Sequence, residues 1–193
     1  MFTPALPILT ERLALRQARA EDLDLWAALE ADPEVVRYLY IDVMPRERSA
    51  ERLAAAIPRV RFSAEHDAVQ LIMERRDTGA AIGHVLLAWT SEIHRAGEIG
   101  WVLAPAHVGH GYATEAARAL LALGFDGLGL HRIVARADAR NHASVRVMRR
   151  LGMRLEAHLV ENEWIKGEWT DEVIAAILED EWRSGATRLR APA

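Results

Sequence analysis

Apolar and polar residues alternate with a period of two in several segments of the chain, which is the pattern of a half-buried β-strand. The predicted strands cover residues 13–17, 68–75, 80–89, 97–103, 133–137, 155–165 and 172–178. Two connections carry turn residues, at Arg76-Asp77-Thr78-Gly79 and at Lys166-Gly167. The second, third and fourth strands are therefore expected to form a meander, and the last two a closing hairpin.

Other segments place apolar residues three and four positions apart, which is the spacing of an amphipathic helix. The predicted helices cover residues 20–30, 34–39, 46–57, 114–123 and 143–151. Pro45 precedes the third helix, and Gly124 and Gly152 are expected to end the fourth and the fifth. Strands and helices in this order, without a linker or a repeat, predict one α+β domain with a mixed sheet over residues 1–193.

The composition is that of an ordinary globular chain, with 51% hydrophobic residues, 27% charged residues and a formal net charge of −4 over 193 residues. An acidic chain without a run of Lys or Arg argues against nucleic-acid binding. The absence of cysteine excludes disulfides, a thiol nucleophile and cysteine-based zinc sites. Neither a signal peptide nor an apolar run of about 18 residues is present, so we expect a cytoplasmic protein without a membrane partner.

The segment 105–116 lies between a predicted strand and a predicted helix, and it carries small residues at Gly109, Gly111 and Ala113. Small residues let the backbone turn sharply and expose its N–H groups. The following helix adds its own free N–H groups and the positive end of its dipole. Such a unit can bind a phosphate or a pyrophosphate. The alternative is that these glycines only turn the chain between strand and helix.

Two nucleotide-binding motifs are excluded at this loop by the identity of its residues. A dinucleotide-binding fingerprint requires a third glycine where this chain has Thr114. A P-loop requires Gly-Lys followed by Ser or Thr, and that sequence does not occur in the chain. A phosphate bound by this loop therefore belongs to neither of these two nucleotide-binding motifs.

The segment Val108-Gly109-His110-Gly111-Tyr112-Ala113 resembles motif A of the GNAT superfamily of acyl-CoA-dependent N-acyltransferases. The stretch 111–116 is most similar to the branch that acetylates the N-terminal amine of ribosomal proteins. Further segments resemble that branch in the same order, at residues 9–16, 98–101, 141–144, 151–153, 167–173 and 181–182. The resemblance covers about residues 8–183, and it implies a mostly antiparallel sheet of about six to seven strands flanked by helices.

The resemblance also implies acetyl-CoA as co-substrate, with the pyrophosphate on the loop amides and the pantetheine arm between the strands at 98–103 and 133–137. The expected cofactor-binding residues are Leu103, Val108, Gly109, His110, Gly111, Tyr112, Ala113, Thr114, Asn141 and Ser144. Val108 departs from the family pattern, which has Arg or Gln at this position. A side-chain contact is therefore lost, and we expect a lower affinity for CoA, although the amide of Val108 is expected to contribute.

Acyl transfer to an amine requires a base for the ammonium proton and an acid for the leaving thiolate. By resemblance, Asn141 holds the pantetheine arm and Ser144 lies near the sulfur as a proton donor. Both residues also fit a local cap of the helix at 143–151. Two carboxylates are candidates for the base, Glu163 as the first choice and Glu98 as the second. The alternative for each is a solvated carboxylate at a strand edge.

The sequence leaves the acceptor open. We expect an N-acetyltransferase in which a primary amine attacks directly in a ternary complex, since neither a cysteine nor a Gly-x-Ser-x-Gly elbow offers a nucleophile. The amine is a protein N-terminus or a small molecule such as a polyamine or an aminoglycoside, and a non-catalytic CoA-binding sensor is the remaining alternative. A homodimer is a further expectation. No metal is expected, because His107 and His110 lie in a loop with no nearby carboxylate.

Overall fold

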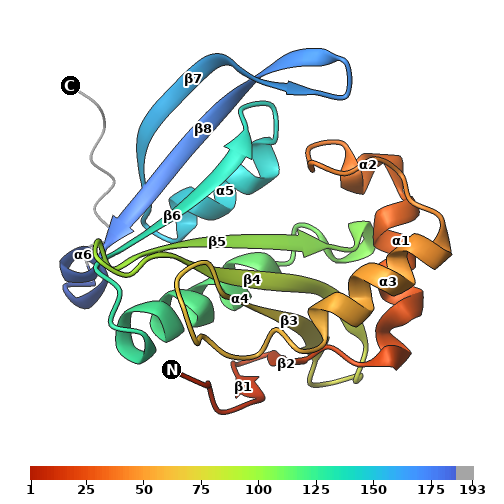
Figure 1. Cartoon of the computed structure of the whole chain (residues 1–193), viewed down its shortest axis with the longest axis horizontal. Helices are drawn as coiled ribbons and strands as arrows, with labels where there is room; N and C mark the ends of the chain where they lie inside the picture. Colours follow the sequence, from red (N-terminus) through yellow and green to blue (C-terminus); the bar gives the residue numbers. More distant parts are fainter. Residues whose placement is uncertain (186–193) are drawn as a thin grey trace.

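The computed structural model describes residues 1–185, which contain one eight-stranded sheet with the order β1-β2-β3-β4-β5-β6-β8-β7 (Figure 1). Neighbouring strands are antiparallel except for β5 and β6, which run parallel. The strands are β1 (Ile8–Leu9), β2 (Leu13–Gln17), β3 (Ala68–Arg75), β4 (Ala81–Ser91), β5 (Ala96–Leu103), β6 (Arg132–Asp138), β7 (Arg154–Ile165) and β8 (Glu168–Leu178).

The strand predictions are confirmed, and one strand is added to them. Every predicted strand is present, with bounds that agree within two residues except at the start of β8, which begins at Glu168 rather than at residue 172. The additional strand is β1, whose two residues pair with Leu15 and Ala14 of β2. A strand of two residues is too short to show an alternation of apolar and polar positions, so the sequence did not predict β1. The sheet therefore has eight strands instead of the six to seven that the resemblance implies.

The helices described by the structure are α1 (Leu23–Ala31), α2 (Pro33–Val36), α3 (Arg46–Ala56), α4 (Tyr112–Ala122), α5 (His142–Arg150) and α6 (Glu179–Arg183). The helix predicted at 20–30 begins as a 3₁₀ turn at Ala20–Asp22, before α1. The helix predicted at 34–39 is shorter than expected, because α2 starts at Pro33 and is regular for four residues only. Turns follow it and lead the chain away toward the closing hairpin.

The prediction that Gly124 ends the fourth helix is wrong. The helix continues from α4 into a π-helical turn at Leu123–Gly127, in which the Leu128 amide donates to the Leu123 carbonyl at 3.0 Å. Gly124 is needed for close packing instead, since a Cβ atom there would lie 2.6 Å from Cδ1 of Ile133 on β6. Gly129, with φ of 65°, follows this turn.

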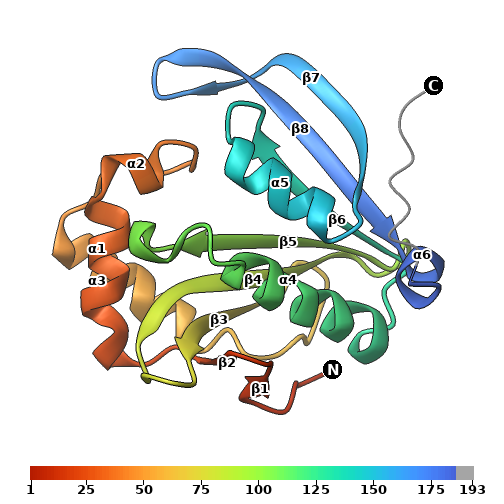
Figure 2. The same cartoon turned by 180° about the vertical axis from the view of Figure 1, so that it is seen from behind.

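Helices cover the two faces of the sheet unequally. Alternate residues of β3 point to opposite faces, so Leu71 packs with Leu120 of α4 in the main core while Ile72 packs with Trp26 and Leu53 beneath α1 and α3. Figure 2 shows α4 and α5 together on one side of the sheet, and α1 to α3 gathered at one end of the other side. The second face is therefore left open along β5, β6 and β8.

A fork opens in the sheet between β5 and β6. These strands pair over three residues each, Ala96–Glu98 with Arg132–Val134, and beyond them they separate (Figure 1). The hairpin of β7 and β8 continues the sheet beyond β6 and arches over the open face toward α2. Separated strands leave backbone groups without ladder partners, so the fork can bind an extended, amide-rich ligand arm.

Candidate active site

The loop before α4 presents a row of free backbone amides. Gly109 and Gly111 have φ values of 90° and 84°, which other residues adopt only with strain. In the part of the chain that the structure describes, the six amides of residues 109–114 have no hydrogen-bond acceptor. The Oγ1 atom of Thr114 is also buried there and has no hydrogen-bond partner among the described residues. This cradle fits a pyrophosphate, since consecutive N–H groups at a helix N-terminus bind anions.

The expectation for the Val108 amide is wrong. That amide donates to the carbonyl of Pro105 at 3.1 Å and closes a 3₁₀ turn, Pro105–His107. The Val108 side chain is exposed by 49% and makes no polar contact. The row of free amides therefore begins at Gly109, one residue later than expected.

Arg12, at the turn between β1 and β2, holds this loop in place. Its guanidinium donates to the carbonyl of His110 at 2.9 Å, forms an ion pair with Glu115 at 2.7 Å and lies 4.6 Å above the ring of Tyr112. The Thr10 hydroxyl donates to the same carboxylate at 2.7 Å. Sequence reasoning missed this support, because no local signal connects residues about 100 positions apart.

A groove of about 590 Å³ continues from the loop along the exposed side of α4. Its polar lining includes Arg12, Thr114, Arg118 and Arg150. Arg118 donates to the backbone carbonyl of Arg150 on α5 at 3.2 Å, so the groove joins the two helices on that side of the sheet. Glu11 and Glu115 also line the groove, so its three guanidinium groups leave a small excess of positive charge beside the free amides.

Asn141 caps α5, as the local alternative predicts. Its side-chain Oδ1 accepts a hydrogen bond from the backbone amide of Ser144 at 3.0 Å. The amide group of the Asn141 side chain remains free to donate. Ser144 is half-buried in the first turn of α5. The pantetheine contact of Asn141 and the proton transfer by Ser144 remain predictions.

The closed end of the fork carries a group of charged side chains on the open face. Nε of Arg136 on β6 lies 3.3 Å from Oε2 of Glu98 on β5, and Nη1 of Arg136 lies 3.4 Å from Oε1 of Glu172 on β8. Glu172 is 2% exposed, and Nδ2 of Asn162 donates to its second oxygen at 3.0 Å. Burial, together with the charge of Glu172, raises the pKa of Glu98 against the opposing effect of Arg136.

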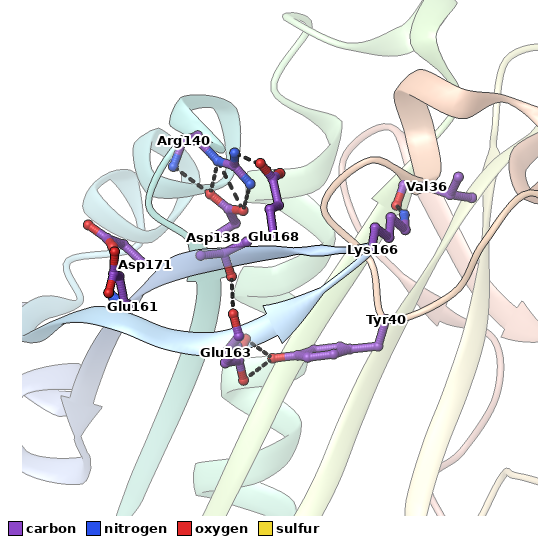
Figure 3. Close-up of polar contacts among 10 residues, drawn as sticks. Val36, Tyr40, Asp138, Arg140, Glu161, Glu163, Lys166, Glu168 and Asp171 are labelled. Carbon is purple, nitrogen blue, oxygen red and sulfur yellow. Dashed lines mark hydrogen bonds and ion pairs between the residues drawn. The ribbon is translucent and has the colours of Figure 1, made fainter.

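Glu163 lies on the same face, near the end of β7. The hydroxyl of Tyr40 lies 2.7 Å from both carboxylate oxygens of Glu163, and Thr170 donates to the Glu163 backbone carbonyl at 3.4 Å (Figure 3). Burial, followed by the hydrogen bond to Glu163, raises the pKa of the Tyr40 hydroxyl. Figure 3 shows Tyr40 reaching under the hairpin from the segment that follows α2.

The structure links the two predicted base candidates through neighbouring residues and not by a direct contact. Asn162, which neighbours Glu163 in β7, contacts Glu172, and Arg136 joins Glu172 to Glu98. Sequence reasoning missed three members of this group: Tyr40, Arg136 and Glu172. Alternation along β8 could have placed Glu172 on the same face as Thr170, but it does not show which side of the hairpin is covered.

The tip of the hairpin contacts α2 directly. Nζ of Lys166 donates to the carbonyl of Val36, the last residue of α2. On the opposite side of the hairpin, Arg140 binds Asp138 at 2.7 Å and Glu168 at 2.9 Å (Figure 3). These contacts hold the hairpin from both sides over the carboxylates of Glu98, Glu163 and Glu172, which we call the acidic group.

The two loop histidines have aromatic rather than ionic surroundings. The rings of His107 and His110 lie 6.3 Å and 6.1 Å from the ring of Tyr112. Within residues 1–185, no cluster of three His, Cys, Asp or Glu side chains is arranged to hold a metal ion. None of the helices in this range is long and apolar enough to cross a membrane.

Comparison with known families assigns the segment that contains the loop and the fork to one domain type. Residues 12–154 match the Acetyltransferase (GNAT) domain family. The chain belongs to the GNAT acetyltransferase family. Its activity is accordingly that of an acetyl-CoA-dependent N-acetyltransferase.

Individual relatives cover nearly the whole GNAT chain. It is 35% identical over 175 residues to YnaD, an uncharacterized N-acetyltransferase of Bacillus subtilis, covering 91% of this chain and 98% of YnaD. It is 25% identical over 168 residues to the spermidine N(1)-acetyltransferase of Escherichia coli K12, covering 87% of each protein. These relatives support the GNAT domain but not the finer assignment to the ribosomal-protein branch.

Solved structures agree with the fold. A GNAT-family acetyltransferase from Bacillus anthracis superposes with a TM-score of 0.79 at 30% identity, covering 94% of this chain and all of that chain. The spermidine N-acetyltransferase from Vibrio cholerae, solved in complex with CoA and spermine, has a TM-score of 0.75 at 26% identity, covering 90% of this chain and 99% of that chain. The mixed sheet with flanking helices is therefore the GNAT fold.

Proposed function

We propose that the protein transfers the acetyl group of acetyl-CoA to a primary amine of a small cationic molecule. The observation that carries this proposal is the acidic group on the open face, in which Glu98 and Glu172 share the guanidinium of Arg136 while the carboxylate of Glu163 is held by the neutral hydroxyl of Tyr40. Carboxylates gathered on one face of a sheet attract and orient an ammonium ion. The relatives named as spermidine acetyltransferases support a polyamine as the acceptor class.

The loop and the fork supply the acetyl-CoA site in this proposal. The amides of residues 109–114 and the N-terminus of α4 bind the pyrophosphate, and the orphaned Thr114 hydroxyl gains a partner there. The pantetheine arm lies between β5 and β6, along Leu103 and beside the free side-chain amide of Asn141. The acetyl group then meets the acidic group at the closed end of the fork.

The chemistry is direct attack by the amine. The ammonium first gives up a proton to a carboxylate, the neutral nitrogen attacks the thioester carbonyl, and the carbon–sulfur bond breaks. Ser144 donates its hydroxyl proton to the thiolate and is reprotonated by the proton that the attacking nitrogen loses. The sequence favours Glu163 as the base, but two observations support Glu98. Burial raises the pKa of Glu98 toward the working range of a base, and the hydroxyl of Tyr40 already engages Glu163.

A protein N-terminus is the second candidate acceptor. The segments that resemble the ribosomal-protein branch, among them Asn141-x-x-Ser144 and Glu163, favour it. An N-terminal ammonium carries the same charge as a polyamine end, so the acidic group suits both. A polyamine and a protein N-terminus differ in size and in the number of further charges. A panel of amines therefore distinguishes the two acceptor classes. A CoA-binding sensor without catalysis is distinguished by the absence of thiol release.

The test is steady-state release of free thiol from acetyl-CoA with a panel of acceptors. The panel contains spermidine, 1,4-diaminobutane, an aminoglycoside and a peptide with a free N-terminal amine, and product masses confirm the acetylated nitrogen. Turnover with the polyamines, above that with the peptide, is the expected result. Turnover with the peptide alone would replace the acceptor class, and binding of acetyl-CoA without any thiol release would contradict catalysis.

A further inference from the structure

Tyr40 is a residue that the acetyl transfer itself does not use. It lies in the segment 37–45 between α2 and α3, and the residue as a whole is 71% exposed. Its hydroxyl nevertheless lies 2.7 Å from both oxygens of Glu163, a residue 123 positions later in the chain (Figure 3). A hydroxyl that contacts both oxygens of a carboxylate restricts the rotation of that carboxylate. The contact of Tyr40 therefore orients Glu163.

The segment that carries Tyr40 is anchored to the hairpin at a second point. Lys166, the single lysine of the chain, donates from the hairpin tip to the carbonyl of Val36. The two contacts lie on either side of the turn that follows α2. They hold Tyr40 and Glu163 against each other at the hairpin, outside the contacts that Arg136 makes with Glu98 and Glu172.

The charges show which carboxylate is left for a ligand. Glu98 and Glu172 share the guanidinium of Arg136. Within residues 1–185, no cationic side chain forms an ion pair with Glu163, whose partner is the neutral Tyr40 hydroxyl. A neutral donor orients a carboxylate without cancelling its charge. Glu163 therefore keeps its capacity to pair with an ammonium.

We propose that Glu163, oriented by Tyr40, binds the second, non-reacting ammonium of a diamine while the first amine reacts beside Glu98. Tyr40 is then a positioning residue that sets specificity for acceptors with two positive charges. The inference rests on the proposed function, because it requires a small amine as acceptor. It adds the requirement for a second charge and assigns that requirement to one pair of residues.

The experiment compares 1,4-diaminobutane with butylamine, which has the same carbon chain and one amine fewer. The variants are Tyr40→Phe, Glu163→Gln and the double variant, with Tyr38→Phe as a matched control from the same segment. Loss of a hydrogen bond to a charged group is worth about a 10-fold change, so Tyr40→Phe is expected to raise KM for the diamine about 10-fold at unchanged kcat. KM for butylamine and the kinetics of Tyr38→Phe are expected to stay at wild-type values.

The double variant tests whether Tyr40 acts through Glu163. Two residues that act as one unit are not additive, so Tyr40→Phe is expected to change KM less than about twofold in the Glu163→Gln background. Equal effects in both backgrounds, or equal effects on the diamine and on butylamine, would overturn the inference while leaving the proposed function intact. Wild-type protein that acetylates neither amine would instead overturn the proposed small-amine acceptor, and the inference with it.

Discussion

Nε of Arg136 lies 3.3 Å from Oε2 of Glu98, at the place where β6 and β5 stop pairing. The ion pair therefore spans the closed end of the fork, and it joins a candidate base to the buried carboxylate of Glu172. Arg136 offsets part of the repulsion between the two carboxylates, yet burial still raises the pKa of Glu98. A carboxylate in this position can accept a proton from an ammonium that enters over the open face.

Acetyl-CoA binding depends on the backbone of the loop before α4. Gly111→Asp places a negative side chain beside the free amides, so we expect binding to fall by at least about 100-fold, which is about 2.7 kcal/mol. Gly79→Asp is the matched control, because Gly79 also has a positive φ of 71° but lies in the distant β3–β4 turn. Calorimetric titration with acetyl-CoA measures both. Unchanged affinity in a folded Gly111→Asp protein would mean that the loop does not bind the pyrophosphate.

Ser144 is predicted to act in the chemical step and not in binding. Ser144→Ala keeps the backbone amide that Asn141 caps, so the helix is preserved while the hydroxyl is lost. We expect kcat to fall about 10²-fold, in the range for a lost acid catalyst, with unchanged affinity for acetyl-CoA. Asn141→Ala is the comparison variant and is expected to lower stability by about 1 kcal/mol through loss of the cap. Rapid-quench kinetics isolates the chemical step, and an unchanged rate there would remove Ser144 from the mechanism.

Gly124 is predicted to be a packing residue. Its missing side chain leaves room for Cδ1 of Ile133, at 2.6 Å from an ideal Cβ. Gly124→Ala is therefore expected to lower the free energy of unfolding by about 1–3 kcal/mol, although alanine favours helices. Ile133→Val removes the opposing methyl group, so the double variant is expected to recover most of the loss. Urea unfolding measures each variant, and a stabilised Gly124→Ala protein would show that the glycine is only tolerated.

The parts of the fold that could be predicted from sequence are those governed by local periodicity. The strands β2 and β3 match their predicted bounds, because a short run rich in apolar residues marks each of them directly. The role of Gly124 could not be predicted, since a glycine near the end of a helical pattern resembles a stop signal. The contact that explains its role comes from Ile133 on β6, and the helical pattern does not show that this strand packs against the helix end.

The candidate site was predictable where its chemistry comes from backbone conformation. The glycines of the loop predict free amides, and the structure has them from Gly109 onward. The contact of Glu163 depends on a bulge in β7, where the register shifts between Leu159 and Glu163. The bulge inserts two residues and places Glu163 opposite Thr170 on β8. No residue type in the hairpin predicts this register shift, so the partners of Glu163 could not be predicted.

The assignment of the base is tested by the pH dependence of kcat/KM for Glu98→Gln and Glu163→Gln with one accepted diamine. A base must be ionised, so wild-type activity falls as the pH drops through the raised pKa of Glu98. We predict that Glu98→Gln loses this acidic limb and about 10²-fold of its rate, so that activity follows the neutral fraction of the amine. Glu163→Gln is predicted to keep the limb and to raise KM. Loss of the limb in Glu163→Gln, with its retention in Glu98→Gln, would contradict the assignment.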